Sequence, residues 1–245
     1  MARLNSYHLP PERWPGPDGK AILDGPEARH LLCVLRARVG EAVRLFDGVG
    51  RHGLFEMTSA VSKSKAELRR LSETIEPAPT RGVTLALGWN KASRRDWLLE
   101  KSVELGALGI LFWQAARSQG DMPGEPKTSW TEKCVQAAKQ CQSTWLPELG
   151  VLAGGIDALL RVAADHDGCY VLYEGAGPQN LLAPKSLVRG RSLVVLGPEG
   201  GLEEREAARL AEAGFSHLSL GPLPLRWETA ALSCLALAHH ALLEP

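Results

Sequence analysis

The feature that most constrains this chain is a short apolar run leading directly into a loop rich in glycine. Residues 193–201 read LVVLGPEGG, and residues 202–214 then show the apolar spacing, acidic first turn and final glycine of a helix. Glycine allows unusual backbone angles and lets a ligand approach the main chain closely. The pattern therefore predicts a buried strand, a loop accessible to a ligand and a helix, although the loop is neither a G-x-G-x-x-G nor a Walker A motif.

Two other segments show a strand followed by a loop that contains glycine. Residues 217–220 form a short apolar run that breaks at Gly221, and a helix with apolar positions up to Leu242 follows. Residues 169–173 are prone to form a strand, which stops at Glu174 and two glycines. Because ligands of α/β proteins usually bind at the carboxyl ends of parallel strands, the three loops predict one shared pocket.

Strand and helix patterns also alternate in the segment before these loops. Residues 82–88 and 110–113 are apolar and strand-like, and capping boxes at 93–96 and 129–132 predict the starts of two helices. This alternation favours a mostly parallel α/β sheet.

A change in composition predicts two domains. Residues 72–80 contain two prolines among polar residues, as is typical of a linker, and we place the domains at residues 1–72 and 80–245. Before the linker, the alternating runs at 42–46 and 53–57 are separated by the turn-forming letters DGVG. The first domain is therefore predicted to be a small β-barrel that contains a hairpin.

Composition is typical of an ordinary soluble enzyme. Of the 245 residues, 44% are hydrophobic and 23% are charged, and no apolar run approaches the roughly 20 residues of a membrane span. The first residues form no hydrophobic secretory segment, and five scattered cysteines fit reduced thiols, so we expect a cytoplasmic protein. His239 and His240 lack metal-ligand spacing, and we expect packing roles for the histidines and cysteines, with no metal and no membrane.

Charge is distributed unevenly although the net charge is zero. Residues 1–72 contain 12 Lys and Arg against 8 Asp and Glu, whereas the rest contains 16 against 20. Phosphates of RNA bind through Lys and Arg, so the first domain is the candidate for an RNA contact. A solvated surface explains the same bias equally well.

The two C-terminal loops resemble those of a known family. The letters LGPEGG at 196–201 and LG-x-x-x-LR-x-ETA at 220–230 look like the signature loops of RsmE-type 16S ribosomal RNA methyltransferases, members of the knotted SPOUT superfamily. The letters HLLCVLR at 30–36 are similar to part of the family's amino-terminal domain, and residues 91–118 resemble its next block. The resemblance thus covers nearly the whole chain.

The resemblance implies a fold, a reaction and partners. The fold would be α/β, with a C-terminal SPOUT-type domain that ties a trefoil knot around a mostly parallel sheet, after a small N-terminal PUA-like β-barrel that grips RNA. The reaction would be methylation of uridine N3 in 16S ribosomal RNA of the small ribosomal subunit, with S-adenosylmethionine as the methyl donor. The protein would be a homodimer.

The resemblance and the loop pattern together nominate the binding residues. We expect cofactor contacts from Leu172, Glu174, Leu196, Gly197, Pro198, Glu199, Gly200, Gly201, Leu220, Gly221, Leu225, Thr229 and Ala230. We expect RNA contacts from Arg3, His30, Arg36, Lys91 and Arg117. For His30 and Arg36, helix capping and packing is the alternative.

Arg226 and Glu228 are the candidates for catalysis. S-adenosylmethionine carries its own electrophile, so the protein has to hold a nucleophile in line with it and exclude water. A uracil N3 nucleophile must lose a proton, and Arg226 can stabilise the resulting anion as a fixed cation. A structural salt bridge to Glu199 or Glu228 is the alternative for Arg226. Glu228 could orient Arg226 or assist proton removal, and Trp227 could stack on a base or contact a partner subunit.

Four positions differ from the family pattern. Leu223 and Pro224 replace the first two residues of an Arg-Ile-Leu-Arg run, and Lys139 and Ser143 replace a glutamate and an arginine. These changes leave two alternatives open, a SPOUT methyltransferase with another RNA target and an RNA-binding or ribosome-assembly protein with impaired catalysis. A metabolic enzyme that uses a nucleotide is disfavoured because no phosphate-binding motif is present.

Overall fold

The structure, a computed structural model, describes residues 4–91 and 94–244 and divides into two compact units. The first unit comprises Met1–Ala78 and Val135–Leu146, and the second comprises Pro79–Cys134 and Pro147–Pro245. Residues 135–146 thus belong with the first unit by their contacts, whereas the division expected from the sequence places them with the second domain.

The first unit is built on one five-stranded sheet with the strand order β1-β3-β4-β5-β2. Its strands are β1 (Ser6–His8), β2 (Lys20–Asp24), β3 (Ala42–Phe46), β4 (Arg51–Ser62) and β5 (Lys65–Ile75). Its short helices are the 3-10 turn η1 (Pro11–Arg13), α1 (Gly25–Arg29) and the single π-turn η2 (His30–Val34). Alternate residues such as Phe55 and Met57 on β4 are buried, so the strand period of two produces the core of this unit.

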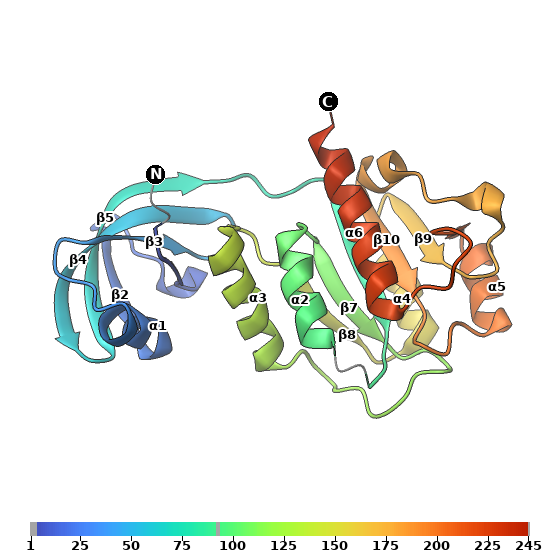
Figure 1. Cartoon of the computed structure of the whole chain (residues 1–245), viewed down its shortest axis with the longest axis horizontal. Coiled ribbons are helices and arrows are strands. Elements are labelled where there is room, and N and C mark those ends of the chain that lie inside the picture. The colour runs from blue at the N-terminus through green and yellow to red at the C-terminus, as the bar shows by residue number, and fades with distance from the viewer. Residues whose placement is uncertain (1–3, 92–93, 245) are drawn as a thin grey trace. The chain divides into compact units, whose positions relative to one another are not determined.

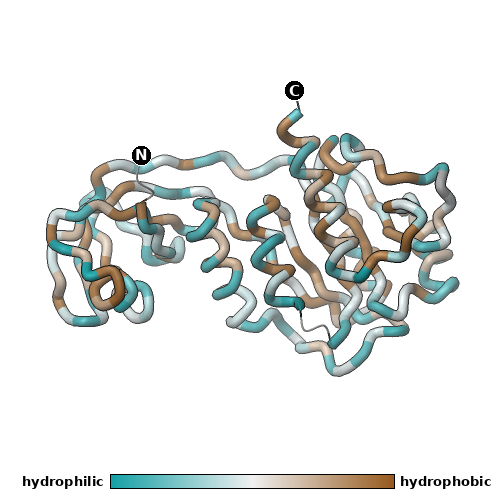
Figure 2. Tube along the Cα trace, viewed as in Figure 1, coloured by the Kyte–Doolittle hydropathy of each residue, from teal (hydrophilic) through white to brown (hydrophobic). Residues whose placement is uncertain are grey.

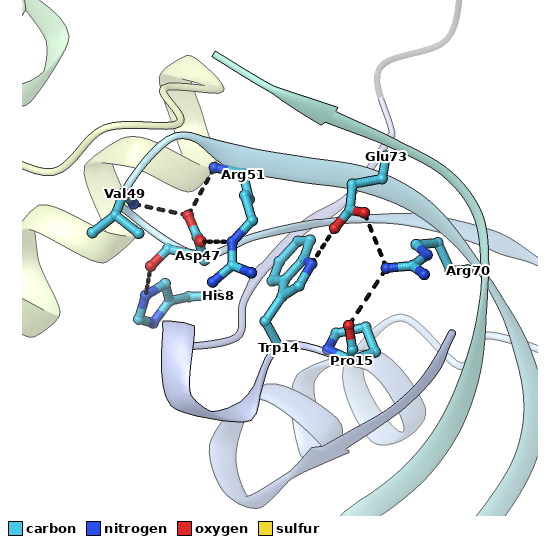
Figure 3. A network of polar contacts seen from close by, with 8 residues as sticks. All are labelled: His8, Trp14, Pro15, Asp47, Val49, Arg51, Arg70 and Glu73. Carbon is cyan, nitrogen blue, oxygen red and sulfur yellow. Dashed lines mark hydrogen bonds and ion pairs between the residues drawn. The ribbon is translucent and has the colours of Figure 1, made fainter. Parts of the chain in front are cut away.

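The predicted hairpin is confirmed as the antiparallel pair of β3 and β4. Its turn is closed by the carboxylate of Asp47, which is fully buried and accepts hydrogen bonds from the backbone of Val49 and from the backbone and Nε of Arg51 (Figure 3). A ring nitrogen of His8 lies 3.2 Å from the carbonyl oxygen of Asp47. One short side chain thereby satisfies the donors of a tight turn.

A second group of polar contacts attaches β5 to the segment after η1. The indole of Trp14 donates to the carboxylate of Glu73, and the guanidinium of Arg70 donates to both Glu73 and the carbonyl oxygen of Pro15 (Figure 3). These contacts lie at the end of a strand that continues to Ile75. The linker predicted at 72–80 begins inside this strand, because ladder pairing to β4 holds residues 72–75 in the sheet. The boundary between the two units, after Ala78, falls within the predicted range.

The second unit is built on a six-stranded sheet with the order β11-β9-β10-β6-β7-β8, in which every pair is parallel. Its strands are β6 (Gly82–Gly88), β7 (Gly109–Trp113), β8 (Glu148–Leu152), β9 (Gly168–Leu172), β10 (Arg191–Leu196) and β11 (Ser216–Leu218). Its helices are α2 (Arg95–Glu104), α4 (Gly155–Ala163), α5 (Glu204–Glu212) and α6 (Trp227–Leu243), with 3-10 turns η3 (Pro178–Asn180) and η4 (Pro184–Val188). The helix α3 (Thr128–Cys141) begins in this unit, and its residues from Val135 on belong to the first unit. The predicted parallel α/β sheet is confirmed.

Helices cover both faces of this sheet, which explains why its central strands are buried along almost their whole length and mostly apolar (Figure 2). On one face, Leu193 and Val195 of β10 pack in a cluster with Leu159 of α4 and Leu210 of α5. On the other face, α6 packs against β6, α2 and η4 (Figure 1). Both faces of β10 are therefore covered, and all of its residues after Arg191 are buried.

The sequence predicts which segments form strands and helices more accurately than it predicts the residue at which each helix begins. The helix predicted at 202–214 is α5, which opens with a capping box between Glu203 and Glu206. The capping box predicted at 129–132 is wrong, because α3 begins at Thr128 and places Ser129 inside its first turn. The other predicted box begins at Ser93, which lies outside the described residues. Within the described chain, no helix is both long and apolar enough to cross a membrane.

Candidate functional site

Three strands of the second unit end at the same level of the sheet. Leu196 of β10 pairs with Leu172 of β9, and Leu172 also pairs with Leu218 of β11. On its other side, Leu196 pairs with Leu87 of β6. The three glycine-bearing loops therefore all leave the sheet at the carboxyl ends of its strands, as the sequence predicts. Ligands of parallel α/β sheets bind at this end of the strands.

Main-chain hydrogen bonds join two of these loops. The backbone N–H of Tyr173 donates to Leu218, and Ser219 both donates to Asn180 and accepts from Leu182. The resulting short parallel bridge between Leu181 and Ser219 joins the segment after η3 to the residue that follows β11. The loop after β11 consequently begins from a fixed point, even though its later residues are exposed.

Gly221 turns the chain at the start of the loop after β11. Its φ is +124°, a conformation that favours glycine, and a side chain added there would meet nothing within 4 Å. The hydroxyl of Ser219 bonds both the N–H and the carbonyl of Gly221 and steadies the turn. Main-chain atoms at this position are therefore open to a ligand.

The loop of residues 197–203 is anchored from two sides. Arg117 donates a 2.9 Å hydrogen bond to the carbonyl oxygen of Gly200. The buried carboxylate of Glu206 accepts from the backbone of Glu203 and from the backbone of Ala116, at 3.0 and 2.8 Å. Residues 116–117, which follow β7, thus hold this loop at its tip and at its end. In this structure Arg117, expected to bind RNA, supports the candidate cofactor loop.

The predicted cofactor residues differ in exposure. Leu196 and Pro198 are buried. The half-buried residues of the set are Leu172, Gly197, Gly201, Leu220, Gly221 and Ala230, and the exposed ones are Glu174, Glu199, Gly200, Leu225 and Thr229. Half-buried apolar side chains beside open main chain suit an adenosine-sized ligand.

The two catalytic candidates occupy different environments at the start of α6. Arg226 is the exposed N-cap residue and forms no ion pair with any described residue. Glu228 is in the first turn, its side chain is 8% exposed, and its Oε1 lies 3.1 Å from Nη1 of Arg94. The predicted alternative of an Arg226–Glu228 salt bridge is wrong, because Arg94 takes the carboxylate. The sequence gives no signal for this pair, which joins residues far apart in the chain.

Aromatic rings surround the residue next to Arg94. The guanidinium carbon of Arg95 lies 3.9 Å from the ring centroid of Trp89 and within 6 Å of those of Phe112 and Trp130. Burial lowers the pKa of Arg95 from its ordinary value. Arg95 also donates to the carbonyl oxygen of Asn90. This group was not predicted, since its members come from the segment after β6, from β7 and from two helices.

The burial of Trp227 argues against both roles considered from the sequence. Its side chain is 5% exposed and packs inside the second unit. A ring so deeply buried cannot stack on a nucleobase or reach a partner subunit without a rearrangement of the start of α6. Its neighbour Arg226 is the side chain that reaches solvent.

The other RNA candidates fall into three groups. His30 is half-buried with its ring centroid 5.9 Å from that of Tyr7, which favours the packing interpretation. Arg36 is exposed with φ +53°, and Lys91 is exposed after β6. Arg3 lies outside the described residues. Arg36 and Lys91 are thus available to RNA, and His30 is less so.

Two of the four atypical residues have structural partners within the first unit. Lys139 bonds both carboxylate oxygens of Glu27 at 2.9 Å, and its ammonium lies 5.3 Å from the ring centroid of Tyr7. The hydroxyl of Ser143 donates to the carbonyl oxygen of Trp145. The other two, Leu223 and Pro224, are exposed in the loop before α6.

Comparison with known proteins decides the family. A model of the RNA methyltransferase domain matches residues 76–239, and a model of the RNA methyltransferase PUA domain matches residues 23–69. The ribosomal RNA small subunit methyltransferase E of Bacillus subtilis is 33% identical over 226 residues, which cover 87% of each chain. The chain belongs to the ribosomal RNA small subunit methyltransferase E family. The member from Mycobacterium tuberculosis is 31% identical over 218 residues, which cover 86% of this chain and 82% of the relative.

Solved structures of this family's fold agree along almost the whole chain. A ribosomal RNA small subunit methyltransferase E from Neisseria gonorrhoeae, bound to S-adenosyl methionine, superposes with a TM-score of 0.78 at 27% identity and 98% coverage of both chains. A putative methyltransferase from Legionella pneumophila, with bound cofactor SAM, gives 0.82 at 26% identity and the same coverage. The α/β SPOUT class with a PUA-like amino-terminal domain is thereby confirmed for this family member, and the trefoil knot stays a prediction.

Proposed function

We propose that this protein transfers the methyl group of S-adenosylmethionine to N3 of a uridine in 16S ribosomal RNA of the small ribosomal subunit. The observation that carries the proposal is that β9, β10 and β11 end at the same level of the sheet. This brings three glycine-bearing loops together at the carboxyl ends of the strands. Relatives with this fold are methyltransferases, and two of them hold the cofactor. Membership of the family supports the RNA substrate, and the chemistry of Arg226 supports N3 as the acceptor.

The loops fit the cofactor by their open main chain. A side chain added at Gly201 or Gly221 would meet nothing within 4 Å, so both backbones face free space. Residues 196–201 and 220–225 would hold the nucleoside through main-chain groups, with Leu172 and Leu220 as half-buried apolar walls. When bound, S-adenosylmethionine supplies an electrophilic methyl group on a positively charged sulfur.

Arg226 would stabilise the nucleophile. The N3 electron pair forms the new bond to carbon, the carbon–sulfur bond breaks with its electron pair left on sulfur, and the N3 proton passes to water. Arg226 is exposed, pairs with no described carboxylate, and caps the positive end of α6. Its guanidinium is therefore free to face the uracil anion that precedes the bond.

The first unit would supply the grip on RNA. We assign this role to the PUA-like domain expected at residues 1–72, with the exposed Arg36 as a contact, and to Lys91 in the second unit. A substrate in the small ribosomal subunit implies action in the cytoplasm. We further infer a homodimer, for which exposed Leu223 and Leu225 beside the site are candidate contacts, and sedimentation equilibrium tests it directly.

The direct test is methyl transfer followed by nucleoside analysis. Purified protein is incubated with isotopically labelled S-adenosylmethionine and small ribosomal subunits that lack the modification, and the RNA is digested for mass spectrometry. We expect labelled 3-methyluridine at one position, and Arg226→Ala is expected to lose most of the rate while its calorimetric Kd for S-adenosylmethionine is retained. Arg209→Ala, which removes an exposed arginine of α5, is the matched control.

Each alternative has its own outcome in that test. Label on a base atom other than N3, or on a ribose 2′-hydroxyl, contradicts the assigned acceptor atom. Label in another RNA but not in the small subunit identifies a different target. RNA binding without cofactor binding would show an RNA-binding protein that has lost catalysis.

A further inference from the structure

Glu228 is a buried carboxylate close to the proposed catalytic arginine. It belongs to the first turn of α6, two residues after Arg226, and its side chain is 8% exposed. An ionised group buried to this extent is costly unless a partner compensates its charge. Arg94 is that partner, with 3.1 Å between Nη1 and Oε1.

Arg226 is not engaged by this carboxylate. As the N-cap residue it has extended backbone angles, φ −62° and ψ 150°, whereas Glu228 lies within the helix. The pairing of Glu228 with Arg94 therefore leaves the Arg226 guanidinium available to a ligand.

Arg94 is held in place through its neighbour. The guanidinium of Arg95 stacks on Trp89, which directly follows β6, with Phe112 and Trp130 at its edges. Such a stack over several rings fixes the start of α2 relative to the sheet. Because α2 also packs on α6, the backbone of Arg94 is carried to the first turn of α6, while its side chain stays 58% exposed.

We propose that Arg94 is a positioning residue for methyl transfer, which neutralises Glu228 so that Arg226 acts on the uridine as an uncompensated cation. The inference rests on the proposed function. Without Arg94, the Glu228 carboxylate would repel the uracil anion and attract Arg226 away from it. Both effects disfavour the deprotonated base that must form before the methyl group is transferred.

The test compares four variants of the full-length protein. Arg94→Met removes the cation, Arg94→Lys keeps a positive charge, and Arg94→Met combined with Glu228→Gln removes both charges. Arg209→Met is the matched control, since it removes an exposed arginine from a 2.6 Å ion pair with Asp157 on the surface of α5 and α4. The measurements are kcat against pH, calorimetric Kd for S-adenosylmethionine and thermal unfolding.

We expect Arg94→Met to lower kcat about tenfold at neutral pH, because one unit of pKa on uridine N3 changes the anion fraction tenfold. The kcat of this variant is expected to increase with pH up to a higher pH than that of the wild type, and its Kd for S-adenosylmethionine is expected to be unchanged. The double variant should be faster than Arg94→Met alone, since no carboxylate remains to oppose the anion. Arg94→Lys should lose less than Arg94→Met, and Arg209→Met should match the wild type.

A full rate in Arg94→Met, or a loss that the second substitution does not relieve, overturns the inference. If Arg94→Met does not fold, Arg94→Lys and the double variant still decide, because a double variant that folds but stays as slow as Arg226→Ala contradicts the charge argument. Failure of the proposed function looks different, since the wild type itself would then produce no 3-methyluridine.

Discussion

Arg117 donates a 2.9 Å hydrogen bond to the carbonyl oxygen of Gly200, joining the segment after β7 to the tip of the loop after β10. The bond connects residues 83 positions apart in the chain. It places a cation that resembles a family RNA contact directly under the candidate cofactor loop. The order of that loop therefore depends on a neighbouring strand as well as on its own glycines.

Removal of this hydrogen bond should weaken cofactor binding. For Arg117→Met we expect the Kd for S-adenosylmethionine to rise roughly two- to tenfold, because a net hydrogen bond contributes about 0.5–1.5 kcal/mol. Isothermal titration calorimetry measures this, with Arg209→Met as control. An unchanged Kd for S-adenosylmethionine together with weaker RNA binding would instead indicate that Arg117 contacts RNA.

Gly88 should tolerate no side chain. A Cβ at Gly88 would clash with the backbone nitrogen of Pro198, so β6 and the loop after β10 would have to separate. We expect Gly88→Ala to lower the free energy of unfolding by about 1–3 kcal/mol, as overpacking commonly does. Chemical denaturation gives the value. Gly124→Ala is the control, because the space around Gly124 is open, and equal stability of the two variants would refute the close approach.

Lys139 should be needed for the stability of the first unit. Its side chain is 11% exposed and that of Glu27 is 19% exposed, so Lys139→Glu would set two poorly hydrated carboxylates against each other. We expect a loss of about 3 kcal/mol in the free energy of unfolding, in line with other broken buried pairs. The exchange of both residues, Lys139→Glu with Glu27→Lys, should recover part of the loss. If the single variant is as stable as the wild type in urea, the pair has no structural role.

The cysteines should divide by burial when the native protein is alkylated. Burial raises the pKa of Cys134 and of Cys234 to about 12, and the thiolate is the reactive form, so both should resist iodoacetamide at pH 8. Exposed Cys33 and Cys141 should react first, and mass spectrometry of peptides gives the order. Labelling in urea provides the control, since all five thiols are then accessible. Early modification of Cys234 in the native state would show that α6 opens.

Local patterns were enough to predict the units of the fold. The apolar run before LGPEGG predicted β10, the alternating runs around Asp47 predicted the β3–β4 hairpin, and the acidic first turn predicted α5. These features depend on side-chain period and on turn chemistry within a few residues, which are properties of the sequence itself. The precise start of α3 was missed because packing, and not the nearest capping residue, sets where a helix begins.

The contacts of the candidate site were decided only in three dimensions. The motifs predict Gly200 and Glu228 as site residues, but their partners Arg117 and Arg94 lie in the loop after β7 and just before α2, far away in the sequence. Lys139 stands where the family pattern has a glutamate, and only the structure shows that it forms an ion pair with Glu27. Hydrophobic period specifies which face of an element is buried, whereas the register of β10 between β9 and β6 determines which loops meet. The sequence alone determined the strands, the loops and the family resemblance, and the tertiary structure determined which charges compensate one another, because ion pairing depends on distance in space.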